Sequence, residues 1–141
     1  MDIEEINAAT PELYAEVKAL MDTLSPGNSF TMGQFRAVVE GESNHLFCLS
    51  EGGHLAGCAT FCTYDTPLGK KGIVEDVVVR ADYRGQHLGR RLLEHILGFA
   101  RGFAPIDVHL TSRPSRVAAN ELYRSLGFDR HETNVYILPL R

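Results

Sequence analysis

Residues 72–80 constrain the fold more than any other part of the chain, because this segment carries isoleucine and valine on both parities of a β-strand. In an extended strand Ile73 and Val74 point to opposite sides, as do neighbouring members of the run 77–79. A strand that is apolar on both sides belongs in the middle of a sheet covered on both faces. The chain is therefore expected to build a central sheet between two outer layers.

The rest of the chain supplies alternating strand and helix patterns. Thr10 with Pro11, and Thr31, have the features of helix N-terminal caps, and Gly127 is predicted to end the last helix. Further strands are predicted at 2–7, 45–50, 54–64, 106–110, 128–132 and 134–140. Four helices are predicted: one at about 11–24, a short one after Thr31, one that follows the turn after the central strand and ends at about 101, and one at 115–126. With no repeat or linker, residues 1–141 are read as a single domain of mixed α/β type with helices on both faces.

Composition excludes several classes of protein. The net charge of −4 argues against a general nucleic-acid binder, which normally carries a basic excess. We find no charged leader with an apolar stretch and no apolar run of membrane-spanning length, so a soluble, cytoplasmic protein without a membrane partner is expected. The cysteines are interpreted as small buried apolar residues, not as a disulfide or metal ligands; they are Cys48, Cys58 and Cys62.

The turn after the central strand has the features of an anion site. No acidic residue lies between Arg84 and Leu93, although a helix start normally attracts acids. Gly85 and Gly89 would let the backbone approach a bound anion closely. The basic residues gathered there are Arg84, His87, Arg90 and Arg91. We favour a cofactor with several phosphates over a solvated basic turn, but this pattern does not distinguish coenzyme A from a dinucleotide.

Two adjacent carboxylates, Glu75 and Asp76, interrupt the central strand. Burying such groups without partners is costly, so they need an explanation. Strand alternation would send them to opposite faces, whereas a local bulge could direct both into a cleft. The alternative is a solvated strand start in which the acids pair with Lys70, Lys71 or an arginine. We favour a functional role, with partial burial raising the pKa of a carboxylate that acts as a base.

Two motifs give the chain a family resemblance. Residues 84–89 read Arg-Gly-Gln-His-Leu-Gly, and residues 118–128 end in Leu-Tyr-Arg-Ser-Leu-Gly-Phe. Over about residues 44–138 the chain resembles the GCN5-related N-acetyltransferase (GNAT) superfamily, whose phosphate motif is Gln or Arg, two residues, Gly, one residue, then Gly or Ala. His87 stands where Gly is usual, and we expect its side chain to point away from the phosphates.

The resemblance implies a mixed, mostly antiparallel sheet of six to seven strands in which two central strands part and acetyl-coenzyme A enters between them. It implies that the pantetheine pairs with strand backbone and that turn amides hold the pyrophosphate. The implied cofactor-binding residues are Val77, Val78, Val79, Arg84, Gly85, Gln86, His87, Leu88, Gly89, Arg90 and Asn120. No metal is expected.

The resemblance also implies direct attack of an amine on the thioester. Glu75 is the first choice for the base and Asp76 the second, while a backbone amide near Val77 would stabilise the oxyanion. Tyr123 matches the position that protonates the departing thiolate in many relatives. A core tyrosine of an amphipathic helix is its structural alternative.

The expected acceptor is a small-molecule primary amine, by similarity of the strand to those of diamine and glucosamine-6-phosphate acetyltransferases. Segments 24–35 and 129–136, with Phe30, His131 and Asn134, would line its pocket. A protein N-terminal or lysine acetyltransferase is the second reading, and a non-catalytic acyl-coenzyme A sensor the third. A homodimer is expected only because relatives are often dimers.

Overall fold

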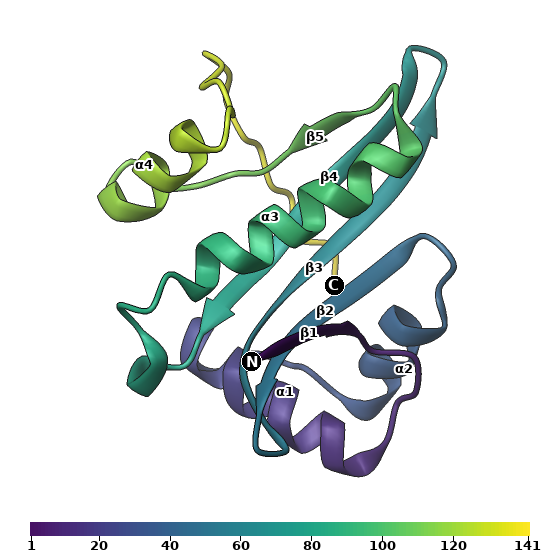
Figure 1. The fold of residues 1–141 in the computed structure, drawn as a ribbon. Coiled ribbons are helices and arrows are strands. Elements are labelled where there is room, and N and C mark those ends of the chain that lie inside the picture. Colours follow the sequence, from purple (N-terminus) through teal and green to yellow (C-terminus); the bar gives the residue numbers. More distant parts are fainter. The chain divides into compact units, whose positions relative to one another are not determined.

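The computed structural model describes residues 1–141 and divides them into two compact units, Met1–Leu110 and Thr111–Arg141. The first unit contains the whole sheet, and the second contains the last helix (Figure 1). The elements of the first unit are β1 (Asp2–Glu5), α1 (Pro11–Leu24), α2 (Met32–Glu40), β2 (Asn44–Glu51), β3 (His54–Thr66), β4 (Gly69–Val79), η1 (Ala81–Tyr83), α3 (Leu88–Ala100), η2 (Arg101–Phe103) and β5 (Asp107–His109). The second unit has α4 (Val117–Ser125). None of the helices combines the length and the apolar character that crossing a bilayer would require.

The predicted caps start the first two helices. The Thr10 hydroxyl accepts a hydrogen bond from the Leu13 amide at 3.2 Å, and the Thr31 hydroxyl accepts one from the Gln34 amide at 3.1 Å. Pro11 occupies the first helical position, where its missing N–H costs no hydrogen bond. Each cap satisfies an amide that has no carbonyl partner within its helix, which fixes where the helix begins.

The sheet is mixed and mostly antiparallel, as predicted. Its five strands run in the order β1-β2-β3-β4-β5, and all neighbours are antiparallel except β4 and β5. The count is below the predicted six to seven, because residues 128–132 and 134–140 form no strand. Strand propensity gives a strand only where a partner supplies backbone hydrogen bonds, and no pairing reaches these residues.

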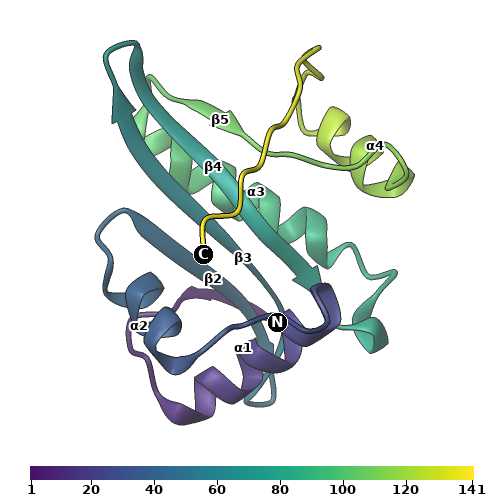
Figure 2. The same cartoon turned by 180° about the vertical axis from the view of Figure 1, so that it is seen from behind.

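Helices cover both faces of the sheet, as the doubly apolar strand requires. α1 and α2 lie on one face and α3 on the other (Figures 1 and 2). The core under α1 and α2 combines Val17, Leu20, Phe35, Leu46, Cys48, Leu55, Cys58 and Val78. On the α3 side, the ring of Phe99 lies 5.2 Å from that of Phe47 and 6.2 Å from that of Phe61. Burial on both faces is the main contribution that holds the three layers together.

Gly72 gives a test of this packing. A Cβ at Gly72 would stand 2.6 Å from two ring atoms of Phe61, which is fully buried. Because that ring has no room to move, we expect Gly72→Ala to lower the free energy of unfolding by about 1–3 kcal/mol. Urea unfolding measures the change.

Gly98→Ala is the matched control. Gly98 lies within α3, and a Cβ there would meet nothing within 4 Å. Alanine favours a helix interior over glycine, so this variant should gain about 0.5–1 kcal/mol. Equal effects of the two substitutions would contradict the proposed packing at Gly72.

Candidate active site

A β-bulge in β4 holds the two predicted carboxylates. Thr60 of β3 pairs with Glu75 and Cys58 pairs with Val78, so Ala59 alone faces two residues of β4. Those two residues are Asp76 and Val77, and Asp76 has a left-handed backbone with φ of 52°. Aspartate tolerates this conformation better than most residues. The bulge allowed for in the sequence is therefore present.

The bulge brings both carboxylates within electrostatic reach of one thiol. The pKa of Cys62 is raised, first by its partial burial and then by the charges of Glu75 and Asp76. Cys62 follows Cys58 and Thr60 at strand spacing, and Cys58 belongs to the core under α1 and α2. We conclude that Glu75 and Asp76 act on the sheet face that α1 and α2 cover in part, instead of on opposite faces.

Glu75 has the environment of a weakened acid. The residue is exposed, yet partial burial of its carboxyl raises the pKa, and the neighbouring Asp76 charge raises it further. Lys70 pairs with Asp65 at 3.1 Å, and neither Glu75 nor Asp76 forms an ion pair. The alternative in which these acids serve as lysine partners is therefore wrong. Carboxylates kept close together without a counter-ion are common at sites that bind cations or move protons.

The edge of β4 beside these acids is unpaired. The pairing of β4 with β5 covers only Lys71–Ile73, while β4 continues to Val79 (Figure 2). The amide of Arg80 donates to the Ala56 carbonyl of β3 at 2.7 Å. Antiparallel alternation then turns the backbone groups of Val79 towards the unpaired edge. This unpaired edge can hydrogen-bond an extended ligand.

The turn before α3 presents amides without competing acids. α3 has no acidic residue in its first turn, and its cap, His87, provides no side-chain hydrogen bond. His87 has φ of 59° and Gly85 has φ of 84°. The left-handed backbone at His87 explains why glycine suits this position, since this conformation costs residues with a side chain about 1–2 kcal/mol. The orientation of the His87 side chain relative to a ligand stays a prediction.

Part of the basic cluster is engaged within the protein. Arg90 pairs with Glu94 one turn further along α3 at 2.7 Å, and a guanidinium nitrogen of Arg91 donates to the Met1 carbonyl at 2.8 Å. Arg84 is exposed and forms no ion pair. Backbone amides, with Arg84 beside them, are therefore the main means of holding an anion here.

In the second unit, the predicted tyrosine belongs to a helix-ending motif. The Phe128 amide donates to the Tyr123 carbonyl at 3.1 Å, and the Gly127 amide donates to the Arg124 carbonyl at 3.0 Å. With φ of 99° at Gly127, this is a Schellman cap, and its usual apolar contact joins the rings of Tyr123 and Phe128 at 6.2 Å. The motif thus has a structural role, and the Tyr123 hydroxyl is left without a hydrogen bond.

Two further properties of this unit bear on the predicted site. Burial raises the pKa of Tyr123, although the charge of Arg116 partly offsets it. The amide nitrogen of Asn120 donates to the carbonyls of Arg113 and Arg116, at 2.9 and 2.7 Å. Asn120 therefore stabilises the start of α4 through its side-chain nitrogen, and only its side-chain oxygen is left for another partner.

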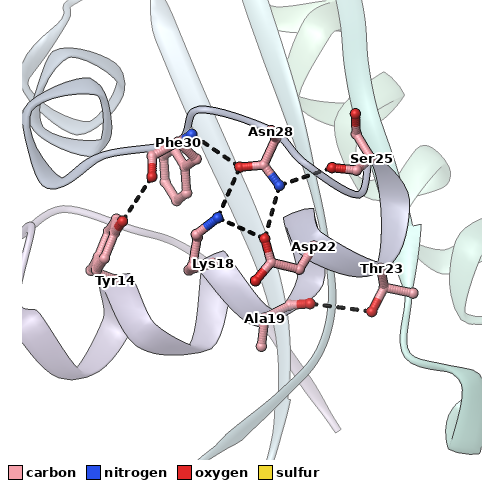
Figure 3. Close-up of polar contacts among 8 residues, drawn as sticks. All are labelled: Tyr14, Lys18, Ala19, Asp22, Thr23, Ser25, Asn28 and Phe30. Carbon is pink, nitrogen blue, oxygen red and sulfur yellow. Dashed lines mark hydrogen bonds and ion pairs between the residues drawn. The ribbon is translucent and has the colours of Figure 1, made fainter.

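The loop between α1 and α2, predicted to line the acceptor pocket, is fixed by Asn28 (Figure 3). Its amide nitrogen donates to Asp22 and to the Ser25 carbonyl, each at 2.9 Å. Its oxygen accepts from the Phe30 amide at 3.0 Å and from Lys18 at 3.1 Å. The Tyr14 hydroxyl donates to the Phe30 carbonyl at 2.8 Å, and the Phe30 ring packs on Tyr14. All four bonding positions of the Asn28 amide are used, so this loop has a defined conformation.

Comparison with known proteins identifies the family. Residues 10–128 match the "Acetyltransferase (GNAT) family". The chain belongs to this family. The match covers most of the sequence and both motifs described above.

The proteins to which this chain is similar include two that are named for different activities. The chain is 38% identical to N-alpha-acetyltransferase RimI of Mycobacterium tuberculosis (strain ATCC 25618 / H37Rv) over 87 residues, covering 62% of this chain and 53% of that protein. It thus spans only about half the length of this curated relative. Glucosamine-6-phosphate N-acetyltransferase from Arabidopsis thaliana superposes with a TM-score of 0.79 at 18% identity, over 98% of this chain and 99% of that one. A candidate acetyltransferase from Agrobacterium tumefaciens str. C58 gives 0.86 at 21% identity, over 99% and 100%.

The register also brings forward residues of this GNAT chain that sequence reasoning did not single out. Thr60 stands directly opposite Glu75, and His109 stands opposite Ile73 on β5. Nothing in the order of residues marks either one, since a threonine in a strand and a histidine before a loop are ordinary. Only the pairing of distant strands shows that they share a face with the carboxylates.

The raised pKa of Glu75 predicts a pH-dependent stability. A carboxyl with a raised pKa costs nothing while protonated and destabilises the fold as pH rises through that pKa. Glu75→Gln should therefore be more stable than the native chain at pH 7, with the difference vanishing at pH 4. Urea unfolding at the two pH values measures it.

Glu16→Gln is the control of opposite sign. Hydrogen bonds from His54 and the Leu55 amide lower the pKa of Glu16, so its stabilising contribution is present at pH 7 and lost as pH falls. We expect this variant to be less stable than the native chain at pH 7. A Glu75→Gln variant that behaved like it would contradict the assigned environment of Glu75.

Proposed function

We propose that this chain is an acetyl-coenzyme A-dependent N-acetyltransferase acting on a primary amine of a small molecule. The observation that carries the proposal is the bulge at Asp76 and Val77, which puts two unpaired carboxylates next to the unpaired edge of β4. The reaction requires a bound acyl donor and a base. The unpaired edge can hydrogen-bond an extended acyl donor, and the neighbouring acidic pair can supply the base.

The residues present fit acetyl-coenzyme A. The unpaired backbone edge of Val77–Val79 suits the amide groups of a pantetheine arm, and the acid-free start of α3 suits a pyrophosphate. Amides of residues 84–90 would hold the phosphates, and Asn120 offers a carbonyl oxygen. When bound, the cosubstrate supplies an acetyl group activated as a thioester.

Glu75 is assigned as the base. An alkylamine is mostly protonated at neutral pH, so one proton must leave its nitrogen before it can attack. The Glu75 carboxylate takes that proton, and its raised pKa makes it a stronger base than an ordinary carboxylate. Asp76 places a second acidic group beside it, which favours a cationic acceptor.

Tyr123 is assigned as the acid. Its raised pKa keeps the phenol protonated at neutral pH, ready to give the hydroxyl proton to the departing thiolate sulfur. The hydroxyl is free to do so, because it has no hydrogen-bond partner of its own. The backbone amide near Val77 is proposed to stabilise negative charge that develops on the acetyl oxygen.

A small amine is preferred as acceptor because of the acidic pair and of the known acceptors of structural neighbours. One neighbour is the glucosamine-6-phosphate enzyme, and another is an aminoglycoside acetyltransferase from an uncultured soil sample, solved in complex with sisomicin. A protein N-terminus is the second candidate, because the mycobacterial relative is an N-alpha-acetyltransferase. A non-catalytic acyl-coenzyme A sensor would bind the cosubstrate without turnover.

The phosphate site can be tested by calorimetric titration with acetyl-coenzyme A. Native protein should bind at micromolar concentration. Gly89→Asp places a carboxylate in the first turn of α3, and we expect it to weaken binding at least tenfold by charge repulsion. Gly98→Ala, at the other end of the same helix, should bind like the native protein. Folded native protein that failed to bind would overturn the acetyltransferase assignment.

Turnover can be tested by thiol release against a set of small amines and of peptides with free N-termini. Glu75→Gln should reduce kcat by about 10²–10⁴-fold while leaving acetyl-coenzyme A affinity unchanged. Release with peptides but not with small amines would favour the second candidate. Binding without release from any acceptor would favour the sensor.

A further inference from the structure

The last residue of β5 lies where β4 and β5 part. His109 pairs with Ile73, and this is the final pair of the parallel ladder. Beyond this pair, β4 stays paired with β3 but has no partner on the β5 side, and Glu75 lies two residues further along it. His109 therefore lies on β5 at the point from which β4 runs towards Glu75 without a β5 partner.

His109 shares a sheet face with Glu75. The side chains of paired residues on parallel strands lie on the same face of the sheet, so His109 is on the face of Ile73. Glu75, two residues after Ile73 on the same strand, is on that face too. An independent contact supports this. The Cδ1 atom of Ile106 lies 3.2 Å from the position of a Cβ at Gly72, on the same face as the Phe61 ring. Ile106 precedes His109 by three residues, so in an extended chain His109 points to the other face.

The separation suits a proton relay. One strand across and two residues along place the Cα atoms of His109 and Glu75 about 8 Å apart. Both residues are exposed, and no direct hydrogen bond joins them. Two side chains of this length, pointing to the same side, can be linked through one water molecule.

Other titratable groups face the same region. On β4 these are Lys71 and the carboxyl pair Glu75 and Asp76, on β5 Asp107, and on β3 Tyr64 and Cys62. Lys71 and Asp107 carry opposite charges and are paired in register on the far side of Ile73 from Glu75. Histidine is the one side chain of this set whose type normally changes charge between pH 5 and 8.

We propose that His109 is the proton-relay residue of this site. The relay rests on the proposed function. The ammonium of the acceptor gives one proton to the Glu75 carboxylate, Glu75 passes it through water to the neutral imidazole of His109, and the imidazolium releases it to solvent. Glu75 is thereby returned to its carboxylate form for the next turnover, with no oxidant or other reactant needed.

The test uses His109→Ala and His109→Gln, with Asp107→Asn as a matched control on the same strand and face. With the best small amine, both His109 variants should lose about 10- to 100-fold in kcat, with unchanged acetyl-coenzyme A affinity and melting temperature. Added imidazole should restore His109→Ala at least partly. The pH profile of kcat should change in His109→Gln, because glutamine cannot take up a proton. Asp107→Asn should keep both the rate and the profile.

The outcomes separate the relay from the function on which it rests. Native protein that releases thiol while the His109 variants keep its rate and pH profile overturns the relay and leaves the acetyltransferase intact. A loss of rate that imidazole does not restore and that leaves the profile unchanged shows a structural role, and it also overturns the relay. Native protein inactive with every amine and peptide overturns the proposed function, and the relay with it.

Discussion

The one-residue bulge in β4 is the constraint on which the rest of the site depends. Val74 and Val78 have the same parity, yet Val74 pairs with Phe61 on the α3 side and Val78 joins the core under α1 and α2. One extra residue between them reverses the alternation. It allows a single strand to bury valine in both cores and still direct two acids to one face. A regular strand would have to leave one of these apolar groups unburied or one carboxylate buried.

This arrangement carries energetic costs that a purely structural strand would avoid. Partial burial and the charge of Asp76 raise the pKa of Glu75, and Asp76 itself has a left-handed backbone. His87 has a left-handed backbone too, at a helix start without an acid to complement the dipole. Such features persist where the surrounding structure holds them in place. Here β4 is held by valines buried in both cores, and the three costly features lie along one stretch of chain.

Much of this was predictable from local sequence. The caps at Thr10 and Thr31 and the helix end at Gly127 follow from short-range hydrogen bonds, so their residue types are sufficient signals. The central strand was recognisable because it is apolar on both parities. The C-terminal strands were predicted wrongly, since residues 134–140 have strand-like composition but no partner. The basic cluster was predicted as a unit, whereas Arg90 and Arg91 are engaged elsewhere.

The sequence by itself determined the order of the elements as far as α4, the family and the identity of the two carboxylates, because periodicity, caps and motifs depend on residues close together along the chain. Only the tertiary structure decided that the acids share one face, that β4 has no β5 partner beyond Ile73 and that His109 stands at the end of that pairing. These properties depend on register, which is set between residues as distant as Thr60 and Glu75 or Ile73 and His109. A shift of one residue in either pairing would reverse every facing side chain without changing any local signal.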